Sequence, residues 1–155
     1  MMQAEVRFAE GAFIEEELKK HGSYASITRG TSMRPLFKTS RDMVIIKPLS
    51  RPLRKYDVVL YTGAYNHYTM HRIIGKKGDI FVIRGDNTYK KEYVTENRII
   101  GVLTEFNRKG KHGTVEDRSF KIYSRFWNFI YPVRHICHKI RCVLSKIKHA
   151  VFKKK

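Results

Sequence analysis

Three short motifs supply the residue types that a serine-dependent hydrolysis of a peptide bond needs. Ser32 lies in Gly-Thr-Ser-Met-Arg-Pro-Leu (30–36), His71 begins His-Arg-Ile-Ile (71–74), and Asp86 lies in Arg-Gly-Asp-Asn (84–87). A serine hydroxyl is a weak nucleophile that needs a base within hydrogen-bond reach, and an imidazole titrates near neutrality. Taken singly, the motifs are also typical of a tight loop, a packed strand and a hairpin turn. Their combination and order predict a nucleophile, a base and a carboxylate in one stretch.

The order of these motifs resembles the signal peptidase I superfamily, which shares its fold with the self-cleaving LexA-type repressors. The likeness runs from about Tyr24 to Leu103 and includes Tyr-Asp-Val-Val (56–59) and Ile-Ile-Gly-Val-Leu (99–103). It implies that Ser32 is the nucleophile. Most bacterial signal peptidases and the LexA group use a lysine as base, whereas histidine followed by arginine is similar to the archaeal and endoplasmic-reticulum branch, which uses Ser-His. The resemblance therefore implies His71 as the general base; it does not include the family's N-terminal membrane anchor.

The same resemblance leaves two candidates for an acidic residue beside the histidine. In the Ser-His branch an acid a few residues past Gly-Asp-Asn orients the imidazole, and Glu92 lies six residues beyond Asp86. Asp86 itself matches a motif residue that shapes the site. An acid in this role fixes the histidine tautomer and stabilises the imidazolium. Both Asp86 and Glu92 are carried as site residues.

The substrate is expected to be an extended peptide, a leader or precursor, that adds a strand to the sheet edge near Tyr24–Arg29. Its carbonyl would lie over Ser32, whose amide is one candidate donor to the oxyanion. Glycine at position 30 allows a substrate backbone to approach closely. The expected substrate-binding residues are Tyr24, Ser26, Thr28, Gly30 and Met33.

Short apolar runs between turn signals predict the architecture around these residues. Turn-forming residues such as Pro48, Pro52 and Gly63 separate the runs, with little helix between them. This pattern predicts a mainly β fold, a signal-peptidase or LexA-like curled antiparallel sheet or partial barrel. The expected strands are Tyr24–Thr28, Met43–Lys47, Asp57–Tyr61, Tyr68–Ile74, Asp79–Arg84 and Arg98–Phe106.

The chain of 155 residues suits one compact unit with two helical appendages. We expect an N-terminal helix within residues 1–22, amphipathic over 3–20, a catalytic domain over 23–124 and a basic amphipathic helix within 125–155. In the last segment apolar residues alternate at spacings of four and three, which predicts one helical stripe. A proline at position 132 predicts a kink or the start of the helix.

The formal net charge of +18 is concentrated at the C-terminus, where Arg125 to Lys155 contain nine Lys or Arg and no acid. Such a segment predicts an interfacial helix on an anionic membrane. A nucleic-acid arm is less favoured, because the apolar stripe is too regular for neutralising phosphates alone. The third alternative is a stripe that packs on the body. The expected membrane- or anion-binding residues are Trp127, Arg134, Lys139, Arg141, Lys146 and Lys148.

The rest of the composition bounds the cellular setting and the chemistry. The sequence has no apolar run of transmembrane length, and its acidic N-terminus excludes a secretory signal peptide, so we expect a cytoplasmic chain that can be peripheral on the inner leaflet. The histidines lack companion ligands at metal spacing, so we expect no metal and no cofactor. The leading hypothesis is a serine endopeptidase. The alternatives are a non-catalytic basic module that binds membrane or nucleic acid, and a self-cleaving LexA-type regulator.

Overall fold

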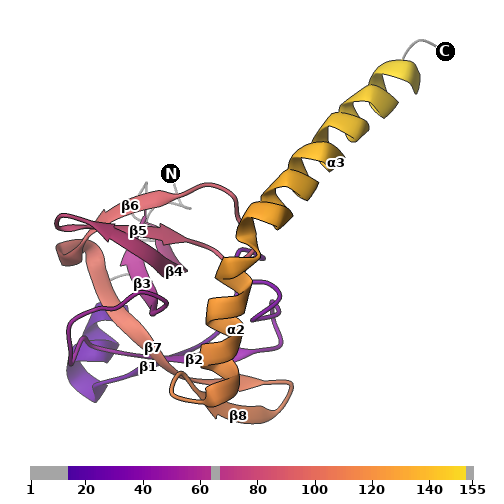
Figure 1. The fold of residues 1–155 in the computed structure, drawn as a ribbon. Helices are drawn as coiled ribbons and strands as arrows, with labels where there is room; N and C mark the ends of the chain where they lie inside the picture. The colour runs from indigo at the N-terminus through magenta and orange to yellow at the C-terminus, as the bar shows by residue number, and fades with distance from the viewer. Residues whose placement is uncertain (1–13, 64–66, 153–155) are drawn as a thin grey trace, which may run out of the picture.

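Eight antiparallel strands form one sheet that curls into a half-barrel (Figure 1). The computed structural model describes residues 14–63 and 67–152, with side chains followed as far as residue 145. Along the sheet the strand order is β1-β2-β7-β3-β4-β5-β6, and β8 pairs with β7. The predicted mainly β class and curled antiparallel sheet are confirmed.

All six expected strands are present, with ends shifted by up to three residues. They are β1 (Tyr24–Ile27), β2 (Met43–Lys47), β3 (Val58–Thr62), β4 (Tyr68–Lys77), β5 (Ile80–Arg84) and β7 (Ile99–Arg108).

Two further strands were not expected, β6 (Glu92–Thr95) and β8 (Lys111–Thr114), and a short 3-10 turn, η2 (Glu96–Arg98), joins β6 to β7. Each of these strands has four residues of which one is buried, so neither carries an apolar pattern long enough to read from sequence.

The two faces of the sheet carry two apolar clusters, because successive strand residues point to opposite faces. One cluster joins the helical residues 14–21 and the Ser32 loop to the sheet. Its buried members include Ile14, Leu18, Met33, Leu36, Phe37, Ile46, Val58 and Leu103. The second cluster fills the curl between β3 and β6 and consists of Val59, Tyr61, Ile73, Phe81, Ile83, Val94 and Ile99. The candidate histidine lies on the same face of β4 as the second cluster.

Two helices end the chain, α2 (Arg118–Phe129) and α3 (Tyr131–Phe152). The predicted break near Pro132 is confirmed, because α3 begins one residue before it, where a missing N–H costs nothing. Helix α2 was not expected, and the predicted boundary at residue 125 falls inside it. Helix α2 lies against the body, whereas α3 projects away from it (Figure 1).

The projection of α3 disfavours one of the three roles expected for this segment, packing of the stripe on the body. Residues 136–145 are all exposed, so the stripe does not pack on the described part of the body. None of the helices described for this chain has both the length and the apolar character needed to cross a bilayer. Part of the expected N-terminal helix, residues 3–13, and the side chains of Lys146 and Lys148 lie outside the described structure.

Candidate active site

The imidazole of His71 is held at one nitrogen by two side chains from two other strands, one adjacent to β4 and one beyond β5. His71 lies in the middle of β4 and is 5% exposed. Its Nδ1 lies 3.1 Å from Glu92 Oε1 and 3.0 Å from the Tyr61 hydroxyl. Tyr61 comes from β3 and Glu92 from β6, so the sheet curl brings three strands together at this ring.

The hydrogen bonds among these three side chains select one tautomer of the histidine. The Tyr61 hydroxyl donates to Glu92 Oε2 at 2.8 Å. Its proton is therefore engaged, and the Nδ1 position of His71 must carry the proton that faces Glu92 Oε1. This leaves Nε2 with a free lone pair, the form that a general base requires. Tyr61 was not singled out from the sequence, where it is one more apolar-looking residue in a buried strand.

Two opposing influences act on the protonation of His71. Burial lowers its pKa below the ordinary value of 6.5, since a charged imidazolium loses its hydration inside the protein. The carboxylate of Glu92 opposes this shift through its charge and its hydrogen bond, and the charge of Asp86 opposes it further. Burial dominates, so the imidazole is neutral at neutral pH and able to accept a proton.

The other ring nitrogen of His71 faces the Ser32 loop across Gly85. A methyl group at position 85 would stand 2.7 Å from the Ser32 carbonyl oxygen and 2.9 Å from His71 Nε2. Glycine is therefore required for this close approach. Nε2 itself is buried and has no hydrogen-bond partner among the described residues. Ser32 is half-buried beside it, and hydrogen bonds between a nucleophile and its base are often loose without substrate.

The loop after β5 holds the Ser32 loop in place through two hydrogen bonds from Asn87. The Asn87 amide donates to the Ser32 carbonyl oxygen at 2.7 Å, and the Asn87 side chain donates to the Thr31 carbonyl oxygen at 3.3 Å. Gly30 enters the loop with φ +74°, a value that glycine adopts without strain. The Gly-Thr-Ser and Gly-Asp-Asn motifs, far apart in sequence, thus form one assembly around His71.

Ser32 lies on the wall of a cleft of about 660 Å³. The cleft runs between β1 with the following loop and the first residues of β4, and Ile27, 58% exposed, presents an apolar side chain beside it. All five residues expected to bind substrate line this cleft: Tyr24, Ser26, Thr28, Gly30 and Met33.

Two of these five differ from expectation in what their side chains do: Met33 is buried in the first apolar cluster, and Thr28 is buried as well. Thr28 is 8% exposed, and its hydroxyl donates towards the carbonyl oxygens of Lys38 and Asp42. Since those bonds close the loop that carries Ser32, the Thr28 side chain holds the cleft wall in shape. Contact with a substrate is left to its exposed neighbours.

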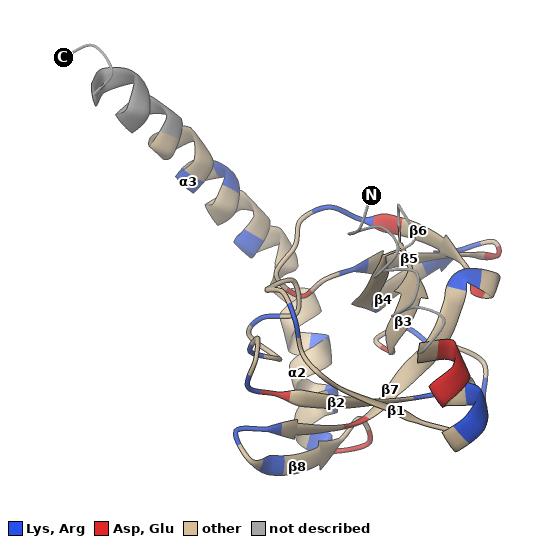
Figure 2. Cartoon of the chain, turned by 180° about the vertical axis from the view of Figure 1, so that it is seen from behind, with Lys and Arg blue, Asp and Glu red and all other residues tan. Residues whose placement is uncertain are grey.

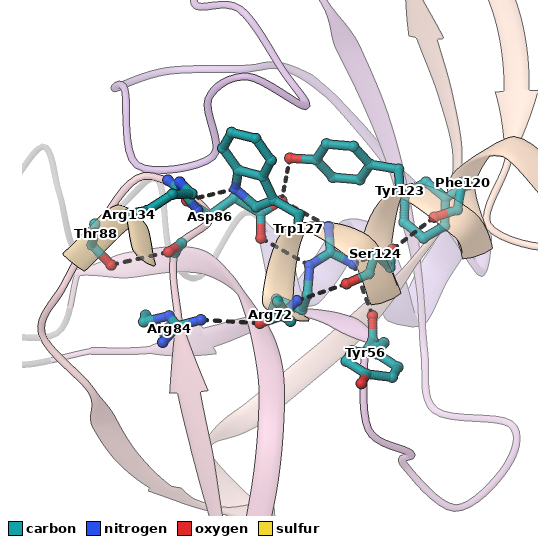
Figure 3. Close-up of polar contacts among 12 residues, drawn as sticks. Tyr56, Arg72, Arg84, Asp86, Thr88, Phe120, Tyr123, Ser124, Trp127 and Arg134 are labelled. Carbon is teal, nitrogen blue, oxygen red and sulfur yellow. Dashed lines mark hydrogen bonds and ion pairs between the residues drawn. The ribbon is translucent and has the colours of Figure 1, made fainter. Parts of the chain in front are cut away.

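Asp86 does not touch His71 but forms a buried ion pair with Arg72 (Figure 3). Two bonds of 2.8 Å join the guanidinium to the two carboxylate oxygens, and the side chains are 0% and 2% exposed. Arg72 also donates to the Tyr56 carbonyl oxygen at 3.0 Å and to Ser124 Oγ at 2.7 Å. Of the two acids carried from the sequence, Glu92 is thus the one that can orient His71, and Asp86 shapes the site.

The loop at Asp86 is also the attachment point of the two C-terminal helices (Figure 3). The Asp86 carbonyl oxygen accepts hydrogen bonds from Trp127 Nε1 at 2.8 Å and from Arg134 at 2.9 Å, and the guanidinium of Arg134 lies 3.7 Å from the Trp127 ring centre. Tyr123 donates to the Asp86 carboxylate at 3.0 Å. Trp127 and Arg134, expected on a membrane-facing surface, are instead half-buried and bound to this loop.

Comparison with known proteins adds no functional assignment to this geometry. The sequence matches no family model and no curated protein. The likeness to signal peptidases therefore stays a prediction, and the chemistry of the site has to be argued from its own atoms.

Proposed function

We propose that this protein is a serine endopeptidase in which Ser32 is the nucleophile, His71 the general base and Glu92 the acid that orients it. The observation that carries the proposal is the placement of the two ring nitrogens of His71. Nδ1 faces Glu92 at 3.1 Å, and Nε2, which has no hydrogen-bond partner in the described part of the chain, faces Gly85 and the Ser32 loop. A packed structural histidine would be expected to pair both of its ring nitrogens, whereas Nε2 here is left free beside the loop that carries a half-buried serine.

The arrangement supports the usual two-step acyl transfer. Ser32 Oγ attacks the substrate carbonyl carbon while His71 Nε2 takes the hydroxyl proton. Glu92 stabilises the imidazolium that forms, and the Ser32 amide is a candidate donor to the oxyanion. His71 then gives its proton to the leaving amine, which leaves an acyl group on Ser32. A water that delivers its proton to His71 completes the hydrolysis and restores the free hydroxyl.

An extended peptide fits the cleft because two strand edges border it. β1 pairs with β2 alone among the described strands, and Tyr68–Met70 of β4 pair with β3 but not with β5, whose pairing begins at Arg72. Open edges of this kind bind a peptide through main-chain hydrogen bonds. A leader or precursor segment threaded along Ser26 and Thr69 would bring a scissile carbonyl to Ser32.

The proposal is tested by covalent labelling of the full chain, read by intact mass. A serine-reactive lipopeptide or β-lactam-type probe should add once to the wild-type protein. It should not add to Ser32→Ala or His71→Ala, and cleavage of a precursor peptide should fall by about a thousandfold or more in both. Ser119→Ala, at an exposed position of α2, serves as the matched control and should label normally. Labelling or cleavage that persists in Ser32→Ala or in His71→Ala contradicts the proposal, as does a wild-type protein that neither labels nor cleaves.

Peptide cleavage is expected to rise with pH through the pKa of His71 and then to level off, because the base must be neutral. Burial lowers that pKa, so the acidic limb of kcat/KM should lie below pH 6.5. In Glu92→Gln the opposing carboxylate is lost, and the limb of the residual activity should move to still lower pH. A pH profile of both proteins measures this. A wild-type limb above 6.5 would argue against a buried imidazole as the base.

A further inference from the structure

A stripe of large apolar side chains is exposed along the outer side of both C-terminal helices. Each member is more than half exposed, and Phe129 is the most exposed at 83%. The spacing alternates between four and three residues through position 143, the period of one helix face. The stripe consists of Ile122, Phe126 and Phe129 on α2 and of Val133, Ile136, Ile140, Val143 and Leu144 on α3.

The stripe continues across the junction of the two helices. The Ile130 amide donates to the Phe126 carbonyl oxygen at 3.0 Å, and the Arg134 amide donates to the Ile130 carbonyl oxygen at 3.1 Å. These two bonds span the junction at Ile130, where α2 ends with ψ 0° and α3 begins one residue later, so the apolar side chains of the two helices follow one another with no connecting loop between them. The apolar face therefore starts beside the body of the protein and runs outward along the projecting helix.

Cations border the stripe, and acids are absent from this part of the sequence. Asp117 is the last acidic residue of the chain. Lys139 and Arg141 stand directly before and after Ile140, so each lies about 100° around the helix from it, one on each flank. Both are exposed, and Figure 2 shows Lys and Arg recurring along α3 with no acidic residue between them.

We infer that this stripe lies in the interfacial region of an anionic lipid bilayer, with α3 parallel to the surface. Apolar side chains would enter the boundary of the acyl chains, and the flanking cations would meet phosphate headgroups. A second copy of the chain is the less suitable occupant. If it paired through the same face, it would bring a second set of cations against Lys139 and Arg141, and its α2 and α3 would supply no acid to pair with them.

The helix is attached at the loop that also holds the Ser32 loop, so membrane binding would orient the cleft. Besides Trp127 and Arg134 on the Asp86 carbonyl oxygen, Tyr89 stacks on His138 with ring centres 4.1 Å apart. These contacts fix the first two turns of α3 to the chain just after Gly85. The inference concerns the partner of the helices and does not rest on the proposed peptidase activity.

Flotation of the full chain with lipid vesicles tests this inference. The protein should float with vesicles of phosphatidylglycerol and phosphatidylcholine in equal parts, and not with phosphatidylcholine alone. Phe126→Ser with Phe129→Ser should weaken binding by about tenfold or more for each phenylalanine. Lys139→Glu with Arg141→Glu should weaken it further at low salt, and 1 M salt should weaken the wild-type protein, because the screening length falls to about 3 Å.

Tyr93→Ser is the matched control, because Tyr93 is 55% exposed but lies on β6, away from the stripe. It should bind vesicles like the wild type, and circular dichroism should show every variant to be folded. Absence of flotation with anionic vesicles overturns the inference, and so does binding that ignores both pairs of substitutions. If the wild-type protein does not bind vesicles but is a dimer in light scattering, and the phenylalanine substitutions make it a monomer, the stripe contacts a second copy of the chain. If the wild-type protein does not bind vesicles and the two phenylalanine substitutions lower its thermal stability, the stripe is covered by another segment of the same chain.

Discussion

Replacing Glu92 by glutamine is expected to lower the rate of peptide cleavage by about three to four orders of magnitude and to leave the fold intact. The carboxylate accepts from two donors at once, the Tyr61 hydroxyl at Oε2 and His71 Nδ1–H at Oε1. Glutamine has one acceptor oxygen and one NH₂ group. If its oxygen keeps Tyr61, its NH₂ donates to Nδ1, and the proton of the imidazole moves to Nε2. A base with its proton on Nε2 cannot accept one from Ser32.

A second substitution separates this tautomer effect from a general disturbance of the site. Tyr61→Phe removes the competing donor, so the glutamine oxygen of the double variant can turn to Nδ1–H. The double variant should therefore cleave faster than Glu92→Gln alone, although Tyr61→Phe by itself should slow cleavage. Glu96→Gln, an exposed change on η2, is the matched control and should be silent. Full activity in Glu92→Gln would remove Glu92 from the mechanism and leave His71 unoriented.

The strands that could be predicted are those in which the apolar residues of the strand's own sequence are the ones that become buried. β2 and β5 are runs of branched and aromatic residues between turns, and both match the expectation closely. β6 and β8 are recognisable only from the strands they pair with, because each buries one residue of four. Their pairing partners are supplied by the tertiary fold, which a local pattern does not contain.

Helix α2 was missed because much of its inner face is polar. Phe120 is buried in the first apolar cluster, but Tyr123, Ser124 and Asn128 form hydrogen bonds with Asp86, Arg72 and Arg84, so the side that packs on the body has no continuous apolar stripe. The apolar stripe of α2 is the exposed one. Periodicity read from sequence assigns an apolar face to the interior, and here that assignment fails for both C-terminal helices.

The residues of the candidate site also fall into those that the sequence pointed to and those that only the fold reveals. Motif order brought Ser32, His71 and Glu92 into consideration; in the fold Glu92 faces His71 Nδ1, and the loop that carries Ser32 lies beyond Gly85 from Nε2. Tyr61 and Arg72 were not named as site residues, because each acts through partners that are distant in sequence: Tyr61 through Glu92, and Arg72 through Asp86 and Ser124. A side chain whose role depends on which strands become neighbours leaves no signal in its own local sequence.

The substitution Arg72→Met is expected to lower the free energy of unfolding by about 3–5 kcal/mol, the cost of leaving a buried charge without its partner. Asp86 would keep one donor to its carboxylate, Tyr123, and would lose the two bonds from the guanidinium. The Tyr56 carbonyl oxygen and Ser124 Oγ would lose a donor as well. Chemical denaturation followed by circular dichroism measures the change, with Arg54→Met, at an exposed arginine, as the matched control.

Adding Asp86→Asn to Arg72→Met should recover part of the lost stability, because the uncompensated negative charge is removed along with its partner. If Arg72→Met costs no more than Arg54→Met, the ion pair does not hold α2 and the Asp86 loop to the sheet. The contrast with the neighbouring residue is informative, since His71 and Arg72 lie on opposite faces of β4. Stability loss at Arg72 and activity loss at His71 would assign one face of this strand to holding the helices and the other to the reaction.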